Sequence, residues 1–153
     1  MNDWKGASAL CINEGRLLMV LQGKEYEEKR WSVPSGGLEE GETLRECCKR
    51  EVWEETGYEV DVRKHLYTKW GCEGSVSTTI HYYEVQLLKG EATLHDPDQL
   101  IHRIEWISLD ELKDLPLCFP EDQSILEAYM SKKQNILSRK ENSHVLAQYT
   151  LEK

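Results

Sequence analysis

One well-delimited helix most constrains what this chain can fold into. Thr43 and Glu46 have the spacing of a capping box, and Gly57 stands where a helix needs a left-handed C-terminal residue. These two signals predict a helix of about four turns over residues 43–56.

The glutamates of this helix are predicted to lie on an unusual face. On an ideal helix, with about 100° per residue, Glu51 and Glu55 fall within about 20° of Leu44, whereas Trp53 points away. Two carboxylates therefore share the side that should face the protein body, where an unpaired charge is costly. The i, i+3, i+4 spacing of Glu51, Glu54 and Glu55 lets their oxygens converge, and such hard ligands suit Mg²⁺ or Mn²⁺.

A second interpretation of these residues is a solvated acidic helix. Between Glu39 and Glu55 the sequence has seven glutamates and three basic residues, and charge runs are typical of exposed faces. The helix alone does not decide between a metal site and a solvated surface.

The segment over residues 36–58 resembles the Nudix box. That motif reads G, five residues, E, seven residues, R-E-U-x-E-E-x-G-U, where U is a bulky apolar residue. Eight positions match: Gly36, Glu42, Arg50, Glu51, Val52, Glu54, Glu55 and Gly57. Tyr58 departs from the pattern, because it is aromatic where the family usually has an aliphatic residue. Eight fixed positions over 23 residues make the match highly specific.

The resemblance implies a hydrolase that cleaves a phosphoanhydride bond of a nucleoside diphosphate linked to another moiety X. Carried over residue by residue, the metal ligands are Glu51, Glu54 and Glu55. Glu42 and Arg50 brace the loop and the helix through an ion pair and complete the catalytic set. Mg²⁺, with Mn²⁺ as a substitute, would neutralise the charge between the carboxylates and the substrate phosphates.

The general base is open at this stage. Glu51 or Glu54 can take the proton of the attacking water, and so can a residue from a downstream loop, where His95, Asp96 and Asp98 stand. For that loop an Asp-Pro turn without catalytic function is an equally simple interpretation.

Substrate contacts are also expected around the glycines. Gly36 and Gly37 let the backbone approach a phosphate, and Trp31 either borders this site or belongs to the core. Five aromatic residues are candidates to stack on a base: Tyr26, Trp31, Trp70, Tyr82 and Tyr83. Tyr82 and Tyr83 are neighbours in a predicted strand and must face opposite sides.

The preferred substrate class is a nucleoside triphosphate, oxidised or not, cleaved by a MutT-like pyrophosphohydrolase. The alternatives are a nucleotide-sugar or dinucleoside-polyphosphate hydrolase, or a non-catalytic module that senses a nucleotide. A purely structural acidic domain is a third class, which the complete box disfavours.

The remaining pattern predicts the α/β/α sandwich of the Nudix fold, a mixed sheet between helices at residues 43–56 and about 121–138, in one domain over residues 1–153. Apolar runs predict a hairpin over residues 7–21, and β-branched and aromatic residues predict a second one over residues 60–88. Further elements are a strand at 101–107, a short helix after Ser108 and a C-terminal strand at 145–151, the last of which could pair within the chain or across a dimer.

Composition excludes other classes of protein. The net charge of −9 opposes non-specific nucleic-acid binding, and no stretch reaches the roughly 20 apolar residues of a membrane span. The five cysteines form no Cys-x-x-Cys pair and are predicted to be reduced thiols. We therefore expect a cytoplasmic protein that acts on a small-molecule nucleotide, with a weak preference for a homodimer.

Overall fold

A seven-stranded mixed sheet forms the centre of the computed structural model, which describes residues 3–151, with side chains through residue 137. Its strands are β1 (Asp3–Asn13), β2 (Arg16–Gln22), β3 (Arg30–Ser32), β4 (Ser35–Gly37), β5 (Tyr58–Glu73), β6 (Val76–Gly90) and β7 (Ile101–Ile107). β1 runs parallel to β6 and antiparallel to β4, and β2 lies between β3 and β7. Both predicted hairpins, β1–β2 and β5–β6, are confirmed.

Helices cover both faces of this sheet. α1 (Leu44–Thr56) packs Cys47, Cys48 and Val52 against one face, in an apolar cluster that includes Ala9 of β1. α3 (Gln123–Leu151) packs Leu126 and Met130 into a second cluster that includes Leu10. Because successive residues of a strand point to opposite faces, the two clusters lie on opposite sides of β1, which confirms the predicted sandwich.

The connection into α3 follows the predicted pattern. α2 (Leu109–Leu112) begins at Ser108 with a capping box, and the single 3-10 turn η1 (Pro120–Asp122) leads directly into α3. Proline at the first position of that turn loses no hydrogen bond, because the first N–H groups of a helix have no partner within it.

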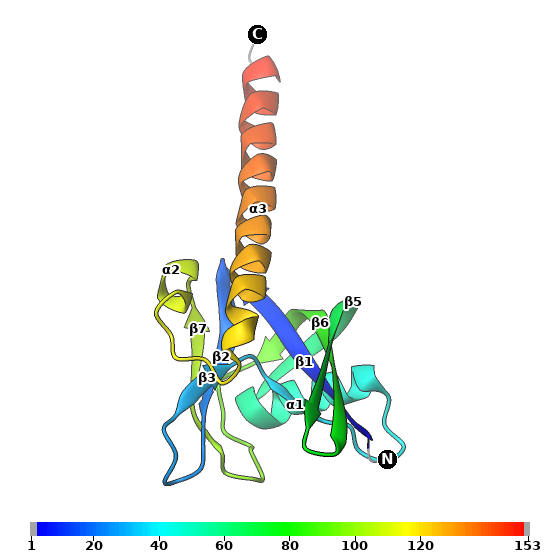
Figure 1. Ribbon diagram of the computed structural model, residues 1–153. Coiled ribbons are helices and arrows are strands. Elements are labelled where there is room, and N and C mark those ends of the chain that lie inside the picture. Colours follow the sequence, from blue (N-terminus) through cyan, green and yellow to red (C-terminus); the bar gives the residue numbers. More distant parts are fainter. Residues whose placement is uncertain (1–2, 152–153) are drawn as a thin grey trace.

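The predicted C-terminal strand at 145–151 and the predicted helix end near 138 are both wrong. α3 continues without interruption to Leu151, and in Figure 1 it leaves the body of the protein with the C-terminus at its far end. The sequence from Gln123 to Leu151 contains neither Gly nor Pro, so nothing stops the helix once it has formed. No helix within residues 3–151 is long and apolar enough to cross a membrane.

Candidate active site

β4 is the strand on which the candidate site is built. It pairs with residues 6–8 of β1, so Gly36 and Gly37 lie in a strand. A Cβ at Gly36 would lie 2.2 Å from Cδ of Glu51, and a Cβ at Gly37 would lie 3.0 Å from Nε1 of Trp4. The two glycines thus let a carboxylate approach one side of β4 and an indole approach the other.

α1 is held in place by both of its predicted caps. Oγ1 of Thr43 accepts a 3.1 Å hydrogen bond from the Glu46 N–H, the Glu46 carboxylate accepts one from the Thr43 N–H, and Gly57 has a φ of 82°. The Glu55 side chain is buried, whereas Trp53 is 44% exposed. The predicted faces of the helix are therefore confirmed.

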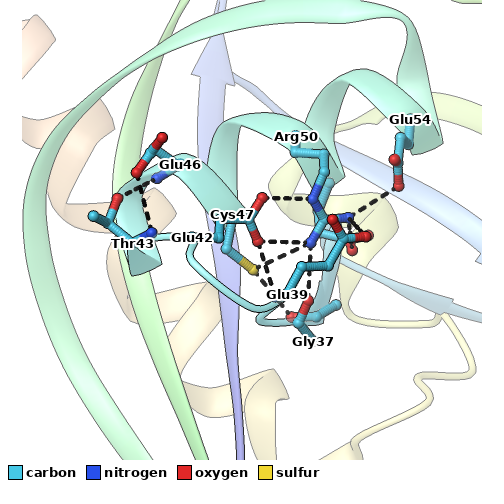
Figure 2. A network of polar contacts seen from close by, with 10 residues as sticks. Gly37, Glu39, Glu42, Thr43, Glu46, Cys47, Arg50 and Glu54 are labelled. Atoms are coloured by element: carbon cyan, nitrogen blue, oxygen red, sulfur yellow. Dashed lines mark hydrogen bonds and ion pairs between the residues drawn. The ribbon is translucent and has the colours of Figure 1, made fainter.

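Arg50 connects the acidic residues of the site, as Figure 2 shows. Its Nε and Nη2 donate hydrogen bonds of 2.7 and 2.9 Å to the two oxygens of Glu42, which confirms the predicted ion pair. Nη1 donates to Glu51 at 2.7 Å and to Glu54 at 3.1 Å, and Nη2 also reaches the carbonyl oxygen of Gly37 at 2.9 Å. One guanidinium group thereby joins the loop, the helix and β4.

The two partners of this ion pair stabilise each other's charge. The hydrogen bond from Arg50 is the main cause that lowers the pKa of Glu42, and it outweighs the opposing effect of burial. The hydrogen bond to Glu42 in turn raises the pKa of Arg50. Both groups therefore stay charged at neutral pH and hold the loop against the helix.

Glu51 and Glu55 form a different kind of pair. Burial raises the pKa of both carboxyl groups, which lie within hydrogen-bonding reach of each other. Glu55 also accepts a 3.3 Å hydrogen bond from the N–H of Ser35, and the charge of Asp96 adds to its raised pKa. Glu55 is buried and Glu51 is half-buried, and among the described contacts Arg50 pairs with Glu51 and not with Glu55. The oxygen atoms of the pair are of the type that binds a divalent metal ion.

The third predicted ligand stands apart from this pair. Glu54 contacts Arg50, and among the described side chains no group of three or more His, Cys, Asp or Glu is arranged to hold a metal ion. The structure thus brings Glu51 and Glu55 together, and it links Glu54 to them through the guanidinium of Arg50.

The downstream loop at residues 91–100 lies against the C-terminal end of α1. The Thr93 N–H donates a 2.9 Å hydrogen bond to the Thr56 carbonyl, and the ring of His95 stacks on Trp53 with centroids 4.6 Å apart and planes 5° apart. The sequence predicted the loop as a candidate, but it gave no signal for this stacking, which joins residues 42 positions apart.

The carboxylate of Asp96 serves the loop itself. It accepts hydrogen bonds from the N–H groups of Asp98 and Ile101 at 3.2 and 3.0 Å, and from the N–H of Leu100. Asp98 is exposed. Asp96 therefore fixes the turn as the structural interpretation expected, and it does so close enough to Glu55 to influence its pKa.

The aromatic candidates divide between core and surface. Trp31 is 8% exposed in the apolar cluster with Met19 and Leu126, as the core interpretation expects. Tyr82 and Tyr83 are buried in opposite clusters, as predicted, and the other two candidates, Tyr26 and Trp70, are 86% and 75% exposed.

Sequence reasoning missed an aromatic cavity next to β4. Trp4, which packs on Gly37, lines a cavity of about 410 Å³ together with Phe119. The other lining residues come from the β5–β6 hairpin: Glu73, Val76, Thr78 and Ile80. Trp4 and Phe119 lie far apart in the sequence, and only the fold brings them to one cavity.

Comparison with known proteins agrees with this geometry. The model of the NUDIX domain family matches residues 4–129, so the chain belongs to the Nudix family. It is 31% identical over 114 residues to "Putative nudix hydrolase 1" of Caenorhabditis elegans, covering 72% of this chain and 30% of that protein. It is 26% identical over 127 residues to "Oxidized purine nucleoside triphosphate hydrolase" of Mus musculus, covering 82% and 78% of the two chains.

Solved structures show the same fold. A NUDIX hydrolase from Nitrosomonas europaea superposes with a TM-score of 0.75 at 22% identity, covering 86% of this chain and 91% of that one. The chain spans only 30–55% of the length of the first three curated relatives that it matches.

Proposed function

We propose that this protein hydrolyses a phosphoanhydride bond of a nucleoside diphosphate linked to X, with Mg²⁺ as cofactor. The observation that carries the proposal is the contact of buried Glu55 with half-buried Glu51, which packs on Gly36 and is joined to Glu54 through Arg50. Such carboxylates have no structural need to be buried together, because a buried pair of like charges destabilises a fold.

Each residue of the site has a proposed task. Glu51, Glu54 and Glu55 would hold the metal ion, which when bound polarises phosphoryl oxygens and acidifies water. Arg50 and Glu42 position the helix against β4, and the backbone of Gly36 and Gly37 would contact a substrate phosphate. Glu51 or Glu54 accepts the proton of the attacking water, while Asp96 is assigned to holding the loop at residues 91–100.

The preferred substrate is a nucleoside triphosphate, including oxidised forms. The aromatic cavity of Trp4 and Phe119 supports this choice, because π-faces bind planar bases and Trp4 packs on Gly37, the neighbour of the glycine that contacts Glu51. The similarity to the mouse hydrolase, which covers most of both chains, also supports it.

The test is release of phosphate and pyrophosphate from a panel of substrates in Mg²⁺, in Mn²⁺ and in chelator. The panel comprises nucleoside triphosphates, oxidised nucleotides, dinucleoside polyphosphates and nucleotide sugars. Glu54→Gln should abolish turnover without loss of fold, and the matched control Glu40→Gln, at an exposed position of the same loop–helix segment, should leave it unchanged.

Turnover on one class of substrate, lost in chelator and in Glu54→Gln, would establish the hydrolase and identify X. Absence of turnover on the whole panel, with tight nucleotide binding retained, would overturn the proposal in favour of a nucleotide sensor.

A further inference from the structure

A second cluster of metal-binding atoms lies on the β5–β6 hairpin, outside the carboxylate site. His65 and Thr68 belong to β5, and Thr68 pairs across the hairpin with His81 of β6. Nε2 of His65 lies 2.8 Å from Oγ1 of Thr68 and 3.3 Å from Nδ1 of His81, and Thr68 Oγ1 lies 3.2 Å from His81 Nδ1. Three donor atoms therefore converge on one point of the hairpin.

The spacing of the two ring nitrogens matches a metal chelate. Two nitrogen ligands at 2.0–2.1 Å from a tetrahedral Zn²⁺ ion are about 3.3–3.4 Å apart. The two nitrogens of His65 and His81 are 3.3 Å apart without any ion between them. The hydroxyl of Thr68 can contact the ion directly or hold a bound water.

The surroundings fix the rings in this arrangement. The His65 ring packs edge-on against Tyr83 with centroids 5.5 Å apart, and it lies 5.4 Å from the His81 ring. Both histidines stand on paired strands, with a register shift between His65 and Tyr67, and the pairing places His65 opposite Tyr83 and Thr68 opposite His81. Preorganised ligands lose little conformational entropy on binding an ion.

The electrostatic environment of His81 also favours its neutral ring, which is the form that binds a metal ion. Burial, His65 and Lys5 lower the pKa of His81, and the neutral imidazole is the form that binds metals. The neighbouring cations are Lys5 of β1, which is exposed, and Arg45 of α1, which is occupied with the Val62 carbonyl and the Tyr83 ring.

We propose that His65 and His81, assisted by Thr68, bind a borderline divalent ion such as Zn²⁺ or Ni²⁺. Imidazole nitrogens prefer such ions, whereas the oxygen ligands around Glu51 prefer Mg²⁺. Since no third His, Cys, Asp or Glu among the described side chains completes the set, water fills the remaining positions. The ion would join β5 to β6 across the hairpin.

The experiment is calorimetric titration of the full chain with NiCl2 and with ZnCl2 in excess Mg²⁺. We expect wild type to bind one ion, His65→Ala and His81→Ala to bind at least about tenfold more weakly, and Glu51→Gln to bind as wild type does. The matched control is His102→Ala on β7, whose ring contacts the Gly23 carbonyl and which should change nothing.

A second measurement separates binding from folding. His65 is exposed, so His65→Ala should unfold at the wild-type temperature in chelator even if His81→Ala does not. Ring nitrogen signals of His65 and His81 should shift on Ni²⁺ or Zn²⁺ addition in nuclear magnetic resonance spectra. Failure of wild type to bind either ion, or binding by His65→Ala and His81→Ala that is as tight as binding by wild type, would overturn the proposal.

Discussion

α1 and α3 are both amphipathic helices packed on one sheet, but they differ in what their buried side contains. α1 is 13 residues long, has caps at both ends and buries a carboxylate, Glu55, beside its cysteines and Val52. α3 is 29 residues long, and its described core contacts are purely apolar at Leu126 and Met130. The comparison shows that α3 contributes apolar packing alone, whereas α1 combines apolar packing with a buried carboxylate that costs stability.

The largest effect is expected from Arg50→Ala in α1. It leaves Glu42, Glu51 and Glu54 without their shared partner, which should lower the free energy of unfolding by on the order of 3 kcal/mol. Activity should fall about 100-fold or more because the carboxylates lose their positions. Thermal unfolding and kcat measure the two effects. An active Arg50→Ala variant would contradict the role of Arg50, and Arg50→Lys should rescue little because it cannot form the bidentate pair.

Leu126→Ala in α3 should show most clearly that the two helices have different roles. The side chain is 2% exposed in the core, so its removal should cost about 2–4 kcal/mol in chemical denaturation. At temperatures where the variant is folded, kcat should stay within about twofold of wild type. A strong loss of kcat in the folded variant would show that α3 also shapes the site.

Thr43→Ala tests how far α1 depends on its cap. Loss of the hydrogen bond that the Glu46 N–H donates to Thr43 Oγ1 should cost about 1 kcal/mol, measured by denaturation in urea. Thr43→Ser keeps the hydroxyl and should be near wild type, so equal loss in both variants would assign the effect to packing.

Acid should weaken α1 through Glu42. Its folded pKa lies below its ordinary value, so its contribution is complete above about pH 4.5 and is lost as the pH falls through the lowered pKa. Between about pH 5 and pH 3, the free energy of unfolding should therefore fall by up to about 1 kcal/mol less in Glu42→Gln than in wild type. Parallel pH dependence in both proteins would exclude Glu42 as the cause.

Leu137→Gln should give the smallest effect. Leu137 of α3 is 54% exposed, and surface substitutions of this kind stay within about 0.5 kcal/mol. Its midpoint in urea should match wild type. A larger loss would show that this part of α3 packs on another surface in solution.

Local signals explain why α1 was predictable and α3 was not. Thr43 and Gly57 specify both ends of α1 by their own hydrogen bonds and backbone angles, and the faces of Glu55 and Trp53 follow from helical period alone. The end of α3 has no such residue. The alternation of apolar residues from Val145 onward is typical of a strand, although no residue in the sequence interrupts the helix before them.

Within the site, the box residues were predictable and their surroundings were not. The ion pair of Glu42 with Arg50 follows from the motif, and it is present at 2.7 Å. The stacking of His95 on Trp53 and the meeting of Trp4 with Phe119 depend on how distant segments fold together. Trp31 was undecided because an aromatic beside a strand can serve a core or a ligand equally well.

The close packing on the two glycines of β4 has a consequence for ligand affinity. Glu51 packs on Gly36 and Trp4, which lines the cavity, packs on Gly37, so a movement of this strand would shift a carboxylate and a wall of the cavity together. An occupant of the cavity that displaced this strand would alter the affinity of the carboxylates for a metal ion bound as proposed. By thermodynamic linkage, binding of the metal ion would then alter the affinity of the cavity for its occupant by the same factor.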